Sequence, residues 1–354
     1  MKFPGKKALL WGAAGTVTAG ALASAGAVVA AGALLNRLRM ADMDGKVVLI
    51  TGGSRGLGFA IAREFASLRS RVVICARNND ELDRAAAELR RSGAEVLTVQ
   101  CDVADQDQVT AMVSRVNEHF GQIDVLVNNA GIISVGPIES QTIEDFHQAM
   151  DVMFWGQVYT TLAVVPEMKR RRSGWIANIS SIGGKISVPH LVPYSCAKFA
   201  SVGLSEGLTA ELAKDRIHVT TVVPGLMRTG SHINAYFKGD HKAEYSWFSL
   251  AATNPISSIG AGRAARSIVR AIRQGQAELV LGVPAKLAAA FHGILPSTTI
   301  RALGVVNRLM PGTGSENKER FLGRDSESTL SQSPLTSLGK RASRDLHQQP
   351  AVTR

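Results

Sequence analysis

The stretch that decides the fold is VVLITGGSRGLG, residues 47–58. Its first part, Val47–Ile50, is a short apolar run that is typical of a strand buried on both faces of a sheet. The remainder is a glycine-rich turn that opens a helical pattern running to Leu68. Glycines let the backbone approach a diphosphate closely, and the N-terminus of the following helix offers free N–H groups. The stretch therefore predicts a phosphate-binding strand, turn and helix.

The same alternation of strand and helix continues to about residue 285. Apolar runs predict further strands at 71–76, 95–100, 123–127, 175–179, 218–223 and 277–282, and helical patterns lie at 79–91, 106–120, 143–169 and 194–214. Strands that alternate with helices of ten or more residues indicate βαβ units and a parallel sheet. We therefore expect an α/β fold, with one doubly wound domain over residues 44–285 and a mostly seven-stranded parallel sheet.

The residue type after the second strand indicates which dinucleotide is bound. A site for NAD usually has a carboxylate there to hold the ribose 2′-hydroxyl, but this strand is followed by Arg77. Arg55 in the glycine-rich turn can approach the same group, and arginine pairs well with phosphate. Two cations and no acid favour NADP(H). The alternative is that both arginines are exposed turn residues.

A tyrosine and a lysine stand one helical turn apart in YSCAK, Tyr194–Lys198. Residues at i and i+4 share a helix face, so the ammonium group of Lys198 is expected near the Tyr194 hydroxyl. A nearby cation favours the phenolate and lowers a pKa that is ordinarily about 10. Ser181 follows the strand at 175–179, where its hydroxyl can hydrogen-bond a substrate oxygen. These three residues are the candidate catalytic groups.

In chain order, the motifs resemble those of the short-chain dehydrogenase/reductase family across roughly residues 44–285. They are TGGSRGLG at 51–58, Asp102-Val103, NNAG at 128–131, Ser181, YSCAK at 194–198 and Pro224-Gly225. The resemblance implies a Rossmann-type domain that transfers a hydride between a nicotinamide and a carbonyl or alcohol, with Tyr194 as acid/base. It also implies pairing through long helices into a homodimer or homotetramer.

The resemblance further implies which residues contact the cofactor. Asp102 and Val103 would contact the adenine, and Lys198 would hold the nicotinamide ribose. Thr229 would contact the carboxamide side of the nicotinamide. The full set of expected cofactor residues is Thr51, Gly52, Ser54, Arg55, Gly56, Leu57, Gly58, Arg77, Asp102, Val103, Asn128, Ala130, Gly131, Tyr194, Lys198, Pro224, Gly225 and Thr229. No metal site is expected.

One position departs from the family pattern. Members usually carry an Asn before the fifth strand, where it helps to hold a water that leads protons to the lysine. The matching stretch here is MFWG, and Met153 occupies the Asn position. A thioether is a poor substitute, since it donates no hydrogen bond. We expect slower turnover, with Gln157 one turn on as a candidate replacement. The alternative function is a non-catalytic NADP(H)-binding sensor or scaffold at a membrane.

The substrate is expected to be lipophilic. The segment 231–255 lies where the family places its substrate loop, and it holds Tyr236, Phe237, Tyr245, Trp247 and Phe248. These aromatic side chains predict a lid over an apolar substrate. The alternative is that they pack the loop onto the domain. His190 stands in the loop before Tyr194 and is interpreted as an ordinary loop histidine.

The N-terminal segment, residues 1–40, is expected to be a membrane anchor. Ala8–Leu35 carries no charge and is long enough for a hydrocarbon core of about 30 Å. A cleaved signal peptide of a secreted protein and an interfacial or hairpin element are the alternatives. Because NADPH is a cytoplasmic cofactor, we expect a membrane-anchored protein whose catalytic domain lies in the cytoplasm.

The distribution of charge along the chain bears on whether the protein binds nucleic acid or a membrane. Lys and Arg exceed Asp and Glu by 11, but the cations are scattered apart from KRRR at 169–172, and no nucleic-acid motif is present. We expect no nucleic-acid partner, and we interpret KRRR as a solvated loop, with a membrane-facing patch as the alternative. Residues 286–311 are apolar and are expected to appose a membrane or to pack on the domain. The polar tail, 312–354, is expected to be disordered.

Overall fold

The computed structural model describes residues 40–254, 257–312, 317–328 and 336–349. The chain divides into two units, and the larger one, Met43–Arg354, contains every helix and strand discussed below. The N-terminal segment that we expect to be an anchor lies outside the described residues, apart from its last position.

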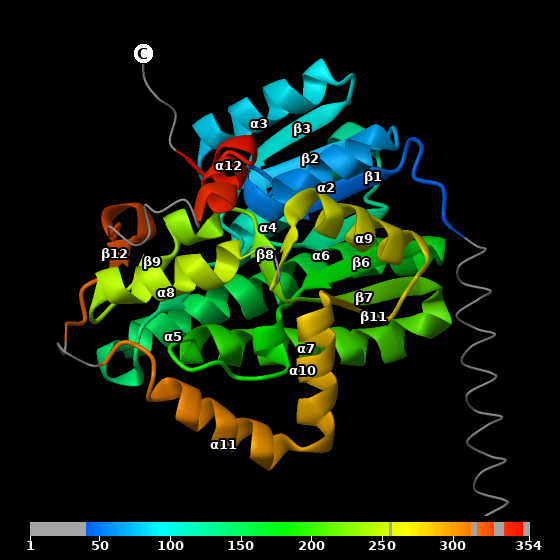
Figure 1. Ribbon diagram of the computed structural model, residues 1–354. Helices are drawn as coiled ribbons and strands as arrows, with labels where there is room; N and C mark the ends of the chain where they lie inside the picture. The colour runs from blue at the N-terminus through cyan, green and yellow to red at the C-terminus, as the bar shows by residue number, and fades with distance from the viewer. Residues whose placement is uncertain (1–39, 255–256, 313–316, 329–335, 350–354) are drawn as a thin grey trace, which may run out of the picture. The chain divides into compact units, whose positions relative to one another are not determined.

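The expected seven-stranded parallel sheet is confirmed, and all seven strands lie within a few residues of their predicted positions (Figure 1). The strands are β1 (Val47–Thr51), β2 (Arg71–Ala76), β3 (Val96–Gln100), β4 (Val125–Asn128), β6 (Gly174–Ile179), β7 (Ile217–Pro224) and β11 (Glu278–Leu281). Their order is β11-β7-β6-β4-β1-β2-β3. The order reverses at β1, so the crevice between the carboxyl ends of β1 and β4 is where a ligand of this fold binds.

Helices cover the sheet in two layers. They are α2 (Gly56–Ser67), α3 (Asn79–Arg91), α4 (Gln106–Phe120), α5 (Ile143–Met150), α6 (Gly156–Arg171), α7 (Val192–Leu212) and α9 (Ala261–Arg273). Helix α2 packs against α3 and α9, whereas α4 packs against α6 and α5 packs against α7. The long helix expected at 143–169 is continuous, but a π-helical turn, Asp151–Trp155, separates α5 from α6.

Local signals explain the helix boundaries. The Asn78 side chain accepts a hydrogen bond from the backbone N–H of Glu81 at the start of α3. Asp105 does the same for the N–H groups of Asp107 and Gln108 at the start of α4. These side chains satisfy N–H groups that have no partner inside the helix. Helix α4 ends at Gly121, which has a positive φ of 85° and so turns the chain into β4.

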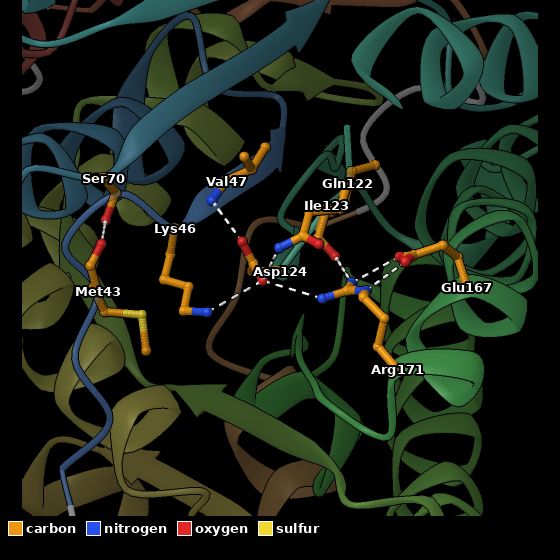
Figure 2. Close-up of polar contacts among 9 residues, drawn as sticks. All are labelled: Met43, Lys46, Val47, Ser70, Gln122, Ile123, Asp124, Glu167 and Arg171. Carbon is orange, nitrogen blue, oxygen red and sulfur yellow. Dashed lines mark hydrogen bonds and ion pairs between the residues drawn. The ribbon is translucent and has the colours of Figure 1, made fainter. Parts of the chain in front are cut away.

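An ion-pair network around Asp124 ties the N-terminal end of the sheet together (Figure 2). Asp124 is 2% exposed and accepts a hydrogen bond of 3.0 Å from the backbone N–H of Val47. Its other oxygen contacts Lys46, at 3.5 Å, and Arg171, at 3.2 Å. Arg171 also pairs with Glu167 on α6. A buried carboxylate is stable here because several donors surround it.

The same network decides the interpretation of the KRRR run. Lys169–Arg171 form the last turn of α6 rather than a loop. Arg171 is engaged with Asp124 and Glu167, and Lys169 pairs with Asp215 at 3.4 Å. Arg172 adopts the left-handed conformation that ends the helix, and it donates to the Lys214 carbonyl. The prediction of a loop is therefore wrong, because the run ends helix α6, but the prediction that it is solvated is confirmed for Lys169, Arg170 and Arg172, which are exposed.

Smaller elements stand beyond the sheet. They are β5 (Ser134–Val135), β8 (Leu226–Arg228), β9 (Tyr236–Phe237), α8 (His241–Thr253), β10 (Ser258–Gly260) and β12 (Phe321–Leu322). Strand β9 lies between β5 and β12 in a three-stranded sheet. Phe237, Tyr245 and Phe248 are buried there and form a small core of their own. Most of the aromatic residues of 231–255 therefore pack the segment onto the domain.

The expectation of a disordered tail is wrong for the tail residues that the structure describes. Strand β12 pairs antiparallel with β9, and Arg320 hydrogen-bonds Asp145 at 2.9 Å. Asp145 also accepts from the buried Lys238, at 2.5 Å. Farther on, α12 (Ser337–Asp345) packs against α8. Contacts with distant parts of the chain order this polar segment, which composition alone could not indicate.

Two apolar helices follow the last strand of the sheet. These are α10 (Val283–Ile294) and α11 (Pro296–Asn307), and Ala285 is the one buried residue among them. Leu287, Ile294 and Leu309 are at least 66% exposed. None of the helices described is both long enough and apolar enough to cross a bilayer.

Candidate active site

A cavity of about 630 Å³ opens at the carboxyl ends of β1, β2, β3, β4 and β6. It reaches from the glycine-rich turn to the candidate catalytic residues. Among the expected site residues, those that line it are Gly52, Ser54, Arg55, Gly56, Leu57, Arg77, Asp102, Val103, Ala130, Gly131, Tyr194, Lys198 and Thr229. The cavity thus joins motifs that are more than 100 residues apart in the sequence. Within the described residues, no cluster of His, Cys, Asp or Glu could hold a metal ion.

Two of the three candidate catalytic residues, Tyr194 and Lys198, line this cavity, whereas Ser181 does not line it but lies next to Tyr194. Tyr194 and Lys198 project from the first turns of α7, and the Lys198 Nζ lies 5.7 Å from the centre of the Tyr194 ring. Ser181 follows β6, and its side chain hydrogen-bonds Tyr194. Gly183 packs so closely that a Cβ there would lie 3.0 Å from the tyrosine ring. The Tyr194 ring is therefore held in place from β6 and from its own helix.

The pKa of Tyr194 differs from the sequence expectation. Burial raises the pKa of Tyr194, and the hydrogen bond with Ser181 acts in the opposite direction. Burial also lowers the pKa of Lys198, to about 8. The expected lowering by Lys198 is absent because the ammonium group points elsewhere: it donates to the Ile179 carbonyl at 2.7 Å. Tyr194 therefore keeps its proton at neutral pH, as a general acid requires.

Contacts between β6 and α7 fix the position of Lys198. Besides the bond from Lys198 to Ile179, the Ser180 hydroxyl donates to the Lys198 carbonyl at 2.9 Å. Gly184 lies against the same carbonyl, where a Cβ would come within 2.5 Å. Neighbouring residues at the end of one strand thus hold both the side chain and the backbone of Lys198.

The glycines of the turn have two different roles. A Cβ at Gly58 would lie 2.2 Å from the Gly52 carbonyl oxygen, so Gly58 allows the turn to close on itself. Gly56 has a positive φ of 59° and faces the cavity. Thr51 does not line the cavity. Its hydroxyl accepts from the N–H groups of Asn129 and Ala130, at 2.9 and 3.0 Å, and so links β1 to the loop after β4.

Both arginines expected at the cofactor's 2′-phosphate already have acidic partners. Arg55 pairs with Glu81 at 2.9 Å, and Ser54 donates to the same carboxylate at 3.1 Å. Arg77 lies 3.8 Å from Asp102. The residues that directly follow β2 include no acid, as the sequence indicates, but the first turn of α3 brings the Glu81 carboxylate to Arg55. The signal in the sequence is Asn78, a residue type that often begins a helix, because its side chain caps α3 at the N–H of Glu81 and so places Glu81 in the first turn.

Three other expected cofactor residues support the site without lining it. The Asn128 side chain bridges β4 to β6, at 2.9 Å from Asn178, and accepts from Thr160 of α6 at 2.7 Å. Pro224 ends β7, and Gly225 packs against Leu281 and Ala285. Sequence reasoning missed several residues that do line the cavity, among them Glu81, Asn129, Asn234 and Gln348.

Met153 lies in the π-helical turn and lines the cavity, and it is 1% exposed. Gln157, the candidate replacement for the missing Asn, accepts a hydrogen bond of 2.8 Å from Ser201 instead of contacting Lys198. Its side-chain nitrogen is buried without a hydrogen-bond partner. The structure thus gives no support to Gln157 as a substitute in the proton relay.

We expect Met153→Asn to raise kcat by up to about tenfold, which corresponds to roughly 1.4 kcal/mol of barrier. The physical reason is that an amide can hydrogen-bond a water near Lys198, whereas a thioether cannot donate. Steady-state kinetics measures the effect. Met153→Leu is the matched control, because it preserves the apolar volume and should leave kcat unchanged. Equal rates for all three proteins would end the relay hypothesis.

The cavity lining includes a group of apolar and aromatic side chains, those of Ile132, Ile133, Met153, Met227 and Tyr236, together with polar ones such as Thr229 and Asn234. Of the five aromatic residues expected in the lid, Tyr236 alone contributes to the cavity lining. His190 is buried and hydrogen-bonds Glu244 at 2.7 Å, so its role is structural, as expected of an ordinary loop histidine.

Comparisons with known proteins agree with this architecture. A family model described as short chain dehydrogenase matches residues 46–236. The SadH protein of Mycobacterium tuberculosis strain H37Rv is 33% identical over 265 residues, which cover 73% of this chain and 94% of that protein. An Anopheles gambiae dehydrogenase/reductase SDR family protein 7-like is 40% identical over 198 residues. That match covers 54% of this chain and 62% of the relative, so it spans less than two thirds of the relative's length.

Solved structures share the fold over their whole length. A short-chain dehydrogenase from Streptomyces avermitilis is 30% identical with a TM-score of 0.65, covering 75% of this chain and 98% of its own. A gluconate 5-dehydrogenase from Burkholderia cenocepacia, solved with NADP and tartrate, is 27% identical with a TM-score of 0.61. This match covers 72% of the chain described here and 99% of the dehydrogenase.

Proposed function

The chain belongs to the short-chain dehydrogenase/reductase family of oxidoreductases, and from that premise we propose an NADP(H)-dependent reductase or dehydrogenase of lipophilic carbonyls and alcohols. One observation carries the proposal: Tyr194 and Lys198 line the same cavity as the glycine-rich turn. A cofactor bound at the glycine-rich turn and a proton donor at Tyr194 could thus act on the same bound substrate. A protein that only binds the cofactor would not need a tyrosine with Ser181 and Lys198 beside it in that cavity.

The residues of the cavity fit a nicotinamide dinucleotide. Gly56 has no side chain of its own on the face that lines the cavity, so a diphosphate can approach its backbone once the Gln348 side chain moves away. Arg55 and Arg77 can meet a 2′-phosphate. When bound, the nicotinamide supplies or accepts the hydride. In reduction, Tyr194 donates its proton to the substrate oxygen, and Ser181 hydrogen-bonds that oxygen as charge develops. Lys198 lines the same cavity and would hold the nicotinamide ribose.

The preference for NADP(H) rests on the two arginines. Glu81 and Asp102 partly neutralise them, but both arginine side chains remain more than a third exposed and can turn to a phosphate. A phosphate dianion competes well with a single carboxylate for a guanidinium group. The apolar side chains in the cavity lining support a lipophilic substrate.

Incubating the purified protein with NADPH or NADH and a panel of apolar ketones and aldehydes tests the function. We expect consumption of NADPH with at least one class of substrate. Binding of NADPH without consumption across the panel would instead favour the alternative, a sensor or scaffold.

We also propose that the protein is held at a membrane with its catalytic domain in the cytoplasm. The uncharged stretch Ala8–Leu35 supports the anchor. The exposed apolar side chains that follow one another along α10 and α11 support a second contact with lipid, because a large exposed apolar patch is rare on a protein surface that contacts only water. Residues 283–309 include Lys286, Arg301 and Arg308 but no acidic residue. This charge pattern favours an anionic lipid surface.

Hydrogen exchange of the full chain with vesicles tests the lipid contact. We expect α10 and α11 to become protected with phosphatidylglycerol vesicles and less so with phosphatidylcholine vesicles. A triple variant of Lys286, Arg301 and Arg308 to Ala should lose most of this protection, since each cation near an anionic surface contributes about 1 kcal/mol.

The matched control removes three cations from elsewhere. Arg263, Arg266 and Arg270 lie exposed on α9, and changing them to Ala alters the net charge equally. This variant should keep the protection of α10 and α11. An equal response of α10 and α11 to both lipid types would contradict the electrostatic part of the proposal.

Pairing into a homodimer or homotetramer stays a prediction.

A further inference from the structure

The end of the chain lies across the glycine-rich turn of the cofactor site. After α12, the Leu346 carbonyl oxygen accepts a hydrogen bond of 2.8 Å from the backbone N–H of Gly56. Figure 1 shows α12, in red, beside the start of α2. This N–H belongs to the first turn of α2 and has no partner inside the helix. Such groups are what a dinucleotide-binding helix offers to a phosphate.

A second contact uses the open face of the same glycine. The Gln348 side chain lies so close that a Cβ on Gly56 would come within 2.4 Å of its amide nitrogen. Gln348 lines the cofactor cavity and is 6% exposed. Asn234, near the substrate end, holds it with bonds of 2.7 Å to its side-chain oxygen and 2.8 Å to its carbonyl. The space that a diphosphate needs at Gly56 is therefore filled by Gln348.

Further contacts show that the tail has a built seat on the domain. The His347 ring stacks on Phe59 of α2, with 4.4 Å between ring centres, and bonds Glu88 of α3 at 2.9 Å. Leu346 is 6% exposed. Ser343 is buried against Gly230, where a Cβ would come within 2.5 Å of it. Contacts from α2, α3 and the loop after β8 thus converge on residues 343–348 of the tail.

We propose that the C-terminal segment 336–349 is an autoinhibitory latch that competes with the cofactor diphosphate for the Gly56 N–H and for the space above it. The inference rests on the proposed function, since it assigns the cavity to a dinucleotide. The tail presents a neutral carbonyl where the cofactor presents a charged phosphate. The latch therefore yields to the cofactor but raises the concentration needed to load it.

The expected size follows from the fraction of molecules whose latch is open. When nine molecules in ten are latched, the apparent Kd for the cofactor is about ten times the intrinsic Kd. A partner or surface that binds the tail would lower the apparent Kd for the cofactor and so increase the fraction of the protein that has cofactor bound. Binding of the tail elsewhere would then control the loading of the cofactor.

Titration of NADPH against the full chain and two variants tests the latch. The first variant lacks residues 336–354, and the second is His347→Ala, which removes the stack on Phe59 and the bond to Glu88. We expect the apparent Kd for NADPH to fall about tenfold in the truncated protein and by a smaller factor in His347→Ala. Arg344→Ala is the matched control, because Arg344 is exposed on α12, and it should bind NADPH like the full chain.

Hydrogen exchange of the unmodified chain provides a readout that does not depend on any variant folding. Saturating NADPH should release the protection of 336–349. Unchanged or weaker NADPH binding in both variants, with unchanged exchange, would overturn the latch and leave the proposed function standing. NADPH binding that releases the tail without any turnover on the carbonyl panel would support the latch and overturn the proposed reaction.

Discussion

Tyr194→Phe is expected to lower kcat for carbonyl reduction by about 10²–10⁴-fold, the range that a positioned proton donor contributes. The substitution removes the one hydroxyl that Ser181 hydrogen-bonds in the cavity and leaves the ring packed on Gly183. Because burial raises the pKa of Tyr194, the wild-type residue is protonated at neutral pH and can donate to a substrate oxygen. Single-turnover oxidation of bound NADPH measures the step directly.

The control for this substitution is Tyr159→Phe on α6. Tyr159 is partly buried and stacks near Trp155, with 6.0 Å between ring centres, but it does not line the cavity. Its variant should keep the wild-type rate. NADPH affinity should be unchanged in both proteins. A Tyr194→Phe enzyme that retained more than about a tenth of the wild-type kcat would exclude Tyr194 as the proton donor.

The second large effect concerns the choice between NADPH and NADH. We expect Arg55→Ala and Arg77→Ala each to raise the Kd for NADPH by about 10–100-fold, because a hydrogen bond to a charged group contributes about 1.5–3 kcal/mol. The Kd for NADH should change little, since NADH lacks the 2′-phosphate. Direct binding titrations with both cofactors measure the ratio.

Arg115→Ala on the exposed side of α4 is the matched control for charge, and it should alter neither Kd. Because Arg55 pairs with Glu81 and Arg77 with Asp102, the two arginines have a second possible role, which is to balance these carboxylates. If the arginines serve only to balance these carboxylates, their loss would leave the cofactor ratio unchanged. That result would argue against an NADP(H) preference while leaving the family and the fold intact.

Some features of the site follow from spacing along one element. Tyr194 and Lys198 share a face of α7 because they are four residues apart, and the helix pattern alone places them together. The order of strands and helices likewise predicts the parallel sheet, since its strands are continuous apolar runs. What spacing could not predict is the direction of the Lys198 ammonium, which is set by the Ile179 carbonyl of another element.

Other features depend on contacts between distant residues. Glu81 neutralises Arg55, and Gln157 binds Ser201 rather than serving Lys198, because the packing of neighbouring elements leaves those groups nearest to each other. The tail was the largest departure from expectation. Its polar composition is typical of disorder, yet Leu346 and Gln348 are buried against the glycine-rich turn.

The sequence by itself determined the doubly wound sheet, the glycine-rich turn after its first strand and the position of Tyr194 and Lys198 on one helix face, because each depends on local periodicity or on short spacing. Tertiary structure alone decided that burial raises the pKa of Tyr194, that Glu81 lies beside Arg55, and that Leu346 and Gln348 cover Gly56. These burials and hydrogen bonds arise only when different elements pack together, and the pattern along one strand or helix does not contain that information.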